Sequence, residues 1–377
     1  EGLFQLESRG MKRFLRQLKP QSLEDIIAAI SLYRPGPMDQ IPLYLQNRAH
    51  PEGITYRHQA LKPILEPTYG TVVYQEQVMA IVRDLAGYSL GRADLVRRMM
   101  SKKKYNQMQK EKEVFLRGCA QNGVDRQTAE AIFAELTDFA NYAFNKSHAA
   151  AYGVVAVRTG WLKRHYPVQF FAALLNSVSS DSGKVAAYSQ YCRKHGIPLL
   201  PPDINQSVRK FSVGRNAQGV SGIRFGLGAI KSCGDKAIDS IIAQRRKGGP
   251  YKDIFDFCQR MDSEQVNKRV VESLILSGAM DCTGARRTQL MAVYESALDG
   301  AAKSRRSNVV GQMSLFGDGL LEEVKPTLPD IPEYNLRTML SLEKNVTGLY
   351  ISGHPLGDYS KALSALDMNT CLLYTSP

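Results

Sequence analysis

Apolar residues recur at helical spacing through most of the first half of the chain. Ser22 and Asp25 have the spacing of a capping box before one such stretch, and Asp125 stands where it can cap another. A further helix is predicted from Ser147, itself a candidate cap, to about residue 165. Pro167 suits the first turn of the next helix, because proline has no amide hydrogen to leave unpaired there. The pattern predicts a mainly helical region up to about residue 195.

The pattern changes in the second half. Residues 196–203 form a proline-rich connector with polyproline-like stiffness, which predicts a domain boundary. Residues 209–213 and 222–226 read as short strands on either side of a turn-prone segment, so we expect a small hairpin. Helical spacing then returns, until charged and turn residues dominate 301–332 and predict an exposed linker. The fold class that follows is mainly α and multi-domain, with a small β content.

The composition of the chain limits the kinds of partner that it can be expected to bind. The 377 residues carry 49 Lys and Arg against 36 Asp and Glu, and a formal charge of +13 favours a polyanionic partner. The most apolar stretch, residues 149–162, is interrupted by Arg158 and is shorter than the roughly 20 residues that a membrane span needs. The six cysteines form no C-x-x-C pair and no zinc spacing, which indicates reduced thiols in the cytoplasm. We therefore expect a cytoplasmic protein without a membrane partner.

The densest cluster of ligand-type chemistry is the stretch from Phe139 to Tyr152. Tyr142 and Phe144 offer ring faces, and the segment that follows adds an amide, a cation and a hydroxyl just before a small-residue helix. Anions and bases are both suitable ligands for such a group. Taken alone, the stretch is equally consistent with a capped helix whose start is packed by two aromatic rings.

This stretch resembles the fingers region of the bacterial replicative DNA polymerase III alpha subunit, a member of the C-family polymerases. The resemblance runs from Gly2 to about Tyr359, with one departure at Ala143, where the family usually has glycine. Four other motifs agree with the family in order: Gly2-Leu3-Phe4-Gln5-Leu6-Glu7-Ser8-Arg9-Gly10-Met11, Leu32-Tyr33-Arg34-Pro35-Gly36-Pro37-Met38, Thr71-Val72-Val73-Tyr74-Gln75-Glu76-Gln77-Val78-Met79, and Ala93-Asp94-Leu95-Val96-Arg97-Arg98-Met99-Met100 with Lys102-Lys103-Lys104 after it.

The resemblance implies three regions. Residues 1–195 correspond to the fingers, 196–325 to a tandem helix-hairpin-helix and clamp-binding region, and 326–377 to the start of a C-terminal region. Because the chain opens inside a family motif, we interpret it as an internal fragment. Residues 371–377 match nothing in the family pattern and resemble a translated sequencing adapter.

Nucleotidyl transfer uses two divalent metals held between carboxylates. No Asp-x-Asp occurs in the chain, and Glu322 and Glu323 lie in the predicted linker, where a solvated pair is expected. The resemblance places the catalytic aspartates and their Mg²⁺ in the palm domain of the parent enzyme. We expect this chain to be inactive as a polymerase by itself.

The fingers can still position and stabilise a triphosphate. Arg97 and Arg98 follow Asp94 on a predicted helix and point to adjacent faces, with Lys102 one turn beyond. A solvated basic helix, and a structural role for His148, are the alternatives. The resemblance implies that the incoming nucleotide is contacted by Arg34, Arg97, Arg98, Lys102, Tyr142, Asn145, Lys146 and His148.

Two further segments resemble the hairpins of a tandem helix-hairpin-helix unit. They are residues 225–238 and 267–280, and in such hairpins backbone amides approach a DNA phosphate without reading sequence. Ser232 stands where the first hairpin usually carries glycine. The alternative is a pair of ordinary helices stopped by glycine. The residues implied in DNA binding are Lys231, Ser232, Gly234, Lys236, Lys268, Arg269, Ser277 and Gly278.

The pentapeptide 312–316 is amphipathic within a polar linker and resembles the motif by which bacterial polymerases bind the sliding clamp. Leu315 and Phe316 would fill an apolar pocket of the clamp, Gln312 would make a polar contact, and Met313 stands where leucine is commoner. The alternative is packing of the apolar pair onto its own domain.

The partners implied by the resemblance are primer-template DNA, deoxynucleoside triphosphates, the sliding clamp and other replicase subunits. The function predicted is thus part of a DNA-directed DNA polymerase. The alternative from another class is a non-catalytic DNA-binding module tethered to the clamp. A repair nuclease with helix-hairpin-helix units would need an acidic metal cluster, which the sequence does not contain.

Overall fold

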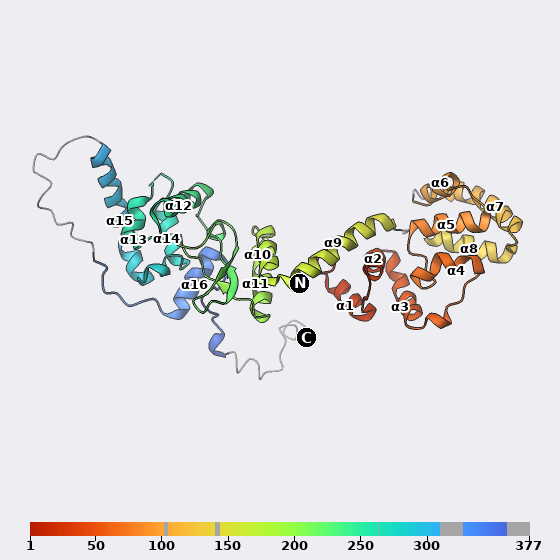
Figure 1. The fold of residues 1–377 in the computed structure, drawn as a ribbon, viewed down its shortest axis with the longest axis horizontal. Helices are drawn as coiled ribbons and strands as arrows, with labels where there is room; N and C mark the ends of the chain where they lie inside the picture. Colours follow the sequence, from red (N-terminus) through yellow and green to blue (C-terminus); the bar gives the residue numbers. More distant parts are fainter. Residues whose placement is uncertain (102–104, 140–143, 263, 310–326, 360–377) are drawn as a thin grey trace, which may run out of the picture. The chain divides into compact units, whose positions relative to one another are not determined.

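The structure, a computed structural model, describes residues 1–101, 105–139, 144–262, 264–309 and 327–359. The chain divides into two compact units, Glu1–His165 and the part from Tyr166 onward (Figure 1). Helices form most of both units, which confirms the mainly α prediction. No helix within the described ranges is long and apolar enough to cross a bilayer.

The first unit contains helices and 3₁₀ turns alone, apart from a single bridge between Tyr74 and Phe144 in its described part. Its helices are α1 (Arg9–Leu18), α2 (Leu23–Leu32), α3 (Ile41–Ala49), α4 (Lys62–Leu65), α5 (Gln75–Ala86), α6 (Leu90–Ser101), α7 (Tyr105–Gln121), α8 (Arg126–Phe139) and α9 (Lys146–His165).

Two apolar clusters fill this unit. One is formed by α1, α2, α3 and α9, and the other by α4 to α8 (Figure 1). The long helix α9 lies against α2 through small residues, since a Cβ added at Gly153 would meet Ile27 Cγ1 at 2.9 Å. Val73 and Tyr74, at the start of α5, are buried in the first cluster, so this segment joins the two clusters.

The predicted helix caps are mostly confirmed. The Ser22 hydroxyl accepts a hydrogen bond from the Asp25 amide in a complete capping box, and Asp125 caps α8 through the Thr128 amide at 2.8 Å. The prediction that Ser147 caps α9 is wrong. The helix begins one residue earlier, and Asn145 Oδ1 accepts from the His148 amide at 2.9 Å. Asparagine caps as well as serine does, so sequence alone does not separate the two positions.

The second unit surrounds a three-stranded sheet with helices. Its helices are α10 (Pro167–Ser177), α11 (Ser182–Lys194), α12 (Asp235–Gly248), α13 (Ile254–Arg260), α14 (Lys268–Leu276), α15 (Arg287–Val309) and α16 (Leu336–Thr347). The strands are β1 (Leu199–Leu200), β2 (Ser212–Arg215) and β3 (Ser221–Arg224), in the order β1-β3-β2. Strands β2 and β3 form the predicted antiparallel hairpin, with Val213 opposite Ile223. Pro167 begins α10, as predicted.

Two features of this unit differ from expectation. The proline-rich connector contributes β1, which pairs in parallel with β3 through Leu199 and Leu200. The predicted linker from residue 301 is wrong at its start, because α15 continues to Val309. Polar and basic residues fill its last turns, so composition there resembles a linker. The rest of the predicted linker up to 326 lies outside the described residues.

One apolar cluster links the whole second unit. Phe171 and Val185 of the helices before residue 195 belong to it, together with Ile238 of α12, Leu274 of α14 and Leu349 beyond α16. The first compact unit therefore ends at His165, earlier than the predicted boundary at 195. Segments before and after the tandem hairpins thus belong to the same folded unit.

Candidate nucleotide and nucleic-acid sites

The start of α5 and the start of α9 meet in the first unit. Phe144 pairs with Tyr74 in a parallel bridge, and the Gln75 amide donates to the Phe144 carbonyl at 2.9 Å. Gln77 Oε1 accepts from the amides of Val73 and Tyr74 at 2.8 and 2.9 Å, which fixes the backbone before α5. The first residues of both helices are therefore held at one place.

Arg97 reaches this place from α6, and Arg98 follows it on the same helix. Arg97 donates to Asp94 Oδ1 at 2.8 Å through Nε and to Gln75 Oε1 at 3.1 Å through Nη1. Arg98 Nε donates to the other carboxylate oxygen of Asp94 at 2.7 Å. The hydrogen bond from Arg97 and the nearby Arg98 charge lower the pKa of Asp94 below its usual value. Both guanidinium groups thus share one carboxylate that stays ionised at neutral pH.

Lys146 lies at the first turn of α9 between two carboxylates. Its Nζ is 3.1 Å from Glu24 Oε2 and 5.2 Å from the centre of the Tyr74 ring. Its backbone amide donates to both oxygens of Glu76, at 3.1 and 3.0 Å. A helix N-terminus attracts anions, and here the Glu76 carboxylate occupies that position.

An aromatic and cationic stack extends from Phe144. The Arg34 guanidinium lies 4.1 Å from the centre of the Phe144 ring. The exposed His148 ring contacts Phe144 edge-on at 5.5 Å and Tyr152 at 4.2 Å between ring centres. Arg34, His148 and Asn145 are thereby placed within one turn of the start of α9.

The structure brings together six of the eight residues predicted for nucleotide binding. Arg97 and Arg98 pair with Asp94, and Lys146 pairs with Glu24; partly exposed ion pairs of this kind contribute only about 0–1 kcal/mol each. Lys102 and Tyr142 lie outside the described residues.

Sequence reasoning missed the acidic and amide partners in this site. Gln75 and Glu76 lie inside the quoted motif from Thr71 to Met79, so that motif contained a usable signal. Glu24 follows the cap of α2 by two residues and gave no comparable signal, because acids are common in the first turn of any helix.

The residues of the first hairpin that are predicted to bind DNA lie on the surface of the second unit. Lys231, Ser232, Gly234 and Lys236 are all exposed, immediately before and at the start of α12. Ser232 has a left-handed backbone, with φ of 64°, the conformation that glycine adopts freely. The serine that stands at the position where glycine was expected thus adopts a backbone conformation that favours glycine.

An acidic residue shares this helix start. Asp235 is the first residue of α12, and its carboxylate is 2.9 Å from Arg209 Nη1. Arg209 also pairs with Asp239 one turn further along the helix. Arg209 therefore neutralises the acids beside the hairpin, which reduces the repulsion that an approaching phosphate would meet.

The second predicted hairpin segment, residues 267–280, consists of α14 and the turn that follows it. Lys268 and Arg269 are exposed in the first turn of α14, and Lys268 Nζ is 3.1 Å from Glu295 and 3.2 Å from Asp299 on α15. Hydrogen bonds from Lys268 to these acids raise its pKa. Both cations lie at the surface, and Lys268 is paired there with two acids.

Ser277 and Gly278 have a different position. Both are buried, and the Ser277 hydroxyl donates to the Leu274 carbonyl at 3.0 Å. Gly278 has a φ of 79°, and a Cβ there would meet Arg287 Nη2 at 2.3 Å. Because both residues are buried, they stabilise the conformation of the turn. Neither residue is placed to contact DNA directly.

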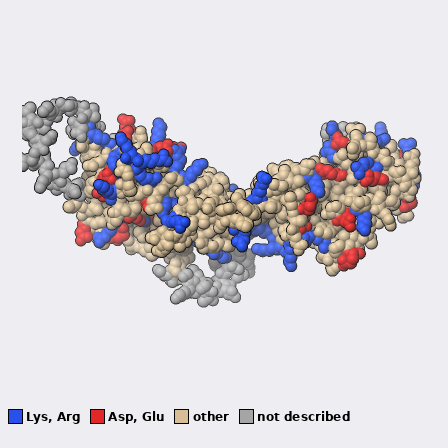
Figure 2. Space-filling model, viewed as in Figure 1, with Lys and Arg blue, Asp and Glu red and all other residues tan. Residues whose placement is uncertain are grey.

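Basic residues also gather beyond the hairpins. Figure 2 shows Lys and Arg side chains over the region of the second unit that contains α12 and α15. Arg246 and Lys247 in the last turn of α12, and Lys303 on α15, are exposed. This basic surface is consistent with the polyanionic partner that the net charge indicates.

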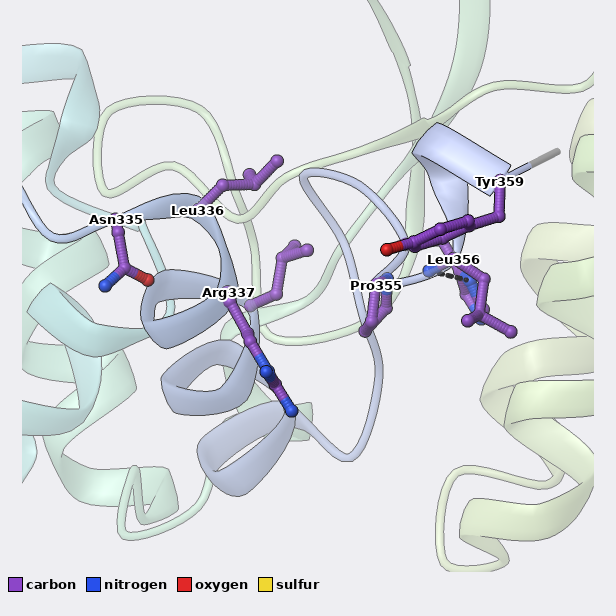
Figure 3. A pocket seen from close by; sticks show the side chains of 8 residues that line it. Asn335, Leu336, Arg337, Pro355, Leu356 and Tyr359 are labelled. Carbon is purple, nitrogen blue, oxygen red and sulfur yellow. Dashed lines mark hydrogen bonds between the residues drawn. The ribbon is translucent and has the colours of Figure 1, made fainter.

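A cavity of about 520 Å³ lies between the start of α16 and the turn after it (Figure 3). Leu336, Leu340 and Leu356 give it apolar walls, and Arg337 and Tyr359 border it. None of the residues predicted from sequence lines this cavity.

The clamp-binding prediction at Gln312, Met313, Leu315 and Phe316 falls outside the described residues.

Comparisons with known proteins agree with the predicted resemblance. The family described as "Bacterial DNA polymerase III alpha subunit finger domain" matches residues 1–123, and "Helix-hairpin-helix motif" matches residues 196–290. DNA polymerase III subunit alpha of Vibrio cholerae is 43% identical over 96% of this chain, that of Thermus aquaticus 46% over 95%, and that of Escherichia coli K12 40% over 96%.

The chain covers 32%, 29% and 32% of these three relatives, so it spans about a third of their length. The finger-domain match covers the segment that supplies Arg34, Arg97 and Arg98, while the start of α9 lies beyond it. The helix-hairpin-helix match includes both predicted hairpins.

Ser232 provides a test of the first hairpin. A non-glycine residue in the left-handed region costs about 1–2 kcal/mol, so Ser232→Gly is expected to stabilise the second unit by about 1 kcal/mol. Urea unfolding followed by circular dichroism measures this change. Ser232→Ala retains the strain and is the control. An equal gain for both variants would show that the serine hydroxyl, rather than the backbone, is at fault.

Proposed function

We propose that this chain, which is homologous over nearly its whole length to bacterial DNA polymerase III alpha subunits, is the nucleotide- and DNA-binding segment of a replicative DNA polymerase. The observation that carries this proposal is the identity of 40–46% over 95–96% of the chain. The cations gathered where α5, α6 and α9 meet support it. In this proposal the parent enzyme extends a primer with deoxynucleoside triphosphates in the cytoplasm.

The first unit is proposed to hold the triphosphate. Arg97 and Arg98 exchange the Asp94 carboxylate for oxygens of the triphosphate. Lys146 turns from Glu24 toward the same triphosphate. Arginine suits this step because its planar guanidinium can donate two parallel hydrogen bonds to a phosphate. Phe144 and the Arg34 guanidinium stacked on it are proposed to lie near the base or sugar of the nucleotide.

The parent activity implies Mg²⁺. Within the part of the chain that the structure describes, no three His, Cys, Asp or Glu side chains lie close enough together to hold a metal. The described residues therefore do not fit this ion, and the role proposed for this chain consists of binding and orienting the nucleotide.

The second unit is proposed to bind duplex DNA through its two hairpins. Lys231 and Lys236 at the first, and Lys268 and Arg269 at the second, supply cations at the surface. Contacts to phosphates carry no sequence information, which suits an enzyme that moves along any template. The pentapeptide 312–316 is proposed to bind the sliding clamp, and other replicase subunits are further partners of the parent.

Arg97→Ala is expected to weaken binding of dATP to the chain about tenfold. The variant loses a charge-assisted hydrogen bond to phosphate, which contributes roughly 1.5–3 kcal/mol. Calorimetric titration measures the dissociation constant. Arg83→Ala on α5 is the matched control, because Arg83 is exposed and pairs with Asp84 away from the start of that helix. Equal affinity of Arg97→Ala and wild type would remove Arg97 from the proposed site.

Duplex DNA binding is expected to weaken linearly in log salt, with a slope of about −0.9 per phosphate contact. Lys236→Ala and Arg269→Ala should each reduce that slope by about one contact. Fluorescence anisotropy over a salt series measures it, with Lys194→Ala, an exposed lysine on α11, as the control. Salt-insensitive binding by the wild type would contradict DNA binding by this unit.

Replacing Leu315 and Phe316 by alanine is expected to abolish binding to a sliding clamp and to leave duplex DNA affinity unchanged. Burial of both side chains contributes about 3–5 kcal/mol at roughly 25 cal/mol per Å² before ordering costs. Calorimetry with clamp and with DNA measures both. The double replacement of Leu320 and Leu321, an apolar pair in the same segment, is the control. Undiminished clamp binding would place the anchor elsewhere, and a parallel loss of DNA binding would mean that the pair packs on its own domain.

A further inference from the structure

Helix α16 contacts both predicted DNA-binding hairpins. The amide of Lys231 in the first hairpin donates to the Val346 carbonyl of α16 at 2.8 Å. Arg287, which begins α15 after the second hairpin, donates through Nη2 to Glu343 Oε1 of the same helix at 3.0 Å. One helix thus connects two turns that lie far apart in the sequence.

The contact with the second hairpin is an ion pair buried in the second unit. The side chains of Arg287 and Glu343 are 3% and 0% exposed. The other carboxylate oxygen of Glu343 accepts from the amides of Ile351 and Ser352 at 3.1 and 3.0 Å, and the Ser352 hydroxyl donates to the carboxylate as well. With these donors in place, the buried charge is fixed in one geometry.

Arg287 transmits this geometry to the hairpin itself. Its guanidinium also pairs with Asp281 at 2.7 Å and lies directly over Gly278. A Cβ at Gly278 would meet Arg287 Nη2 at 2.3 Å, so the glycine leaves the space that the paired guanidinium occupies. A shift of α16 would therefore move the turn of the second hairpin, through Arg287. It would also move the Val346 carbonyl, which accepts the hydrogen bond from the Lys231 amide of the first hairpin.

We propose that α16 is a brace that sets the spacing of the two hairpins, with Glu343 and Arg287 as its positioning residues. This inference rests on the proposed DNA binding by the hairpins. Two contacts held at a fixed spacing bind a duplex that reaches both more tightly than one that reaches a single hairpin, because the second contact forms at a high effective concentration. Loss of the brace should remove this advantage without removing either contact.

The test compares a duplex long enough for both hairpins with one that can occupy only one. In Glu343→Gln the ratio of the two affinities should fall about tenfold, while the affinity for the short duplex stays unchanged. Glu272→Gln, the same change of charge on α14, is the matched control. Ile241→Val, a core change in the same unit, controls for lower stability, since mere destabilisation leaves the ratio unchanged at a temperature where the unit is folded.

Hydrogen exchange without DNA gives a second readout of the brace. The Lys231 amide should exchange faster in Glu343→Gln than in the wild type, because its acceptor on α16 is displaced. If Glu343→Gln does not fold, Ser352→Ala, which removes one donor and retains the charge pair, is measured in the same way. An unchanged affinity ratio or an unchanged Lys231 exchange rate in the folded variant overturns the brace. A wild type that binds neither duplex overturns DNA binding instead, and the exchange rate of Lys231 still decides whether α16 holds the hairpin.

Discussion

A carboxylate with no access to solvent, that of Glu343, organises the second unit. An unpaired buried charge costs several kcal/mol, so this residue is tolerated only where donors surround it. Arg287 and the backbone of Ile351 and Ser352 supply them, and Arg287 in turn covers Gly278. The segment after residue 327 is therefore as much a part of this unit as the hairpins are. The helix-hairpin-helix match, which ends at residue 290, does not include it.

The ion pairs around the start of α5 and α9 in the first unit differ from this buried pair. The pairs of Arg97 with Asp94 and of Lys146 with Glu24 are partly exposed, with the side chains of the two cations 28% and 38% accessible. Such pairs contribute little to stability and are easily exchanged. A buried pair fixes a shape, whereas an exposed pair keeps a cation charged and available. The same kinds of side chain thus have a structural use at Glu343 and, in the proposed function, a ligand-binding use at the start of α5 and α9.

Much of the local structure could be predicted because its causes are local. The capping box at Ser22, the cap at Asp125 and the hairpin of β2 and β3 depend on residues a few positions apart. The family motifs also pointed to the cations of the first unit, although they did not identify the acids that balance them. The choice of Asn145 over Ser147 as a cap was undetermined, because both residue types are good caps and they stand only two positions apart.

Contacts between distant residues were not predictable from the pattern. The pairing of β1 with β3, and the link between Arg287 and Glu343, join segments whose own spacing gives no sign of a partner. The same holds for α15, whose last turns have the composition of a linker because few of their residues need to be buried. Exposed helix and exposed linker differ in backbone hydrogen bonds rather than in residue type.

The length of α15 has a mechanical consequence for the partner proposed for the pentapeptide at 312–316. The helix ends at Val309, so only Val310 and Gly311 separate it from Gln312. At no more than about 3.6 Å per residue, the start of the motif stays within roughly 11 Å of the helix end. A partner bound there would stay close to the end of α15. The direction of that helix, more than the length of the connecting segment, would therefore limit the positions that the partner can occupy.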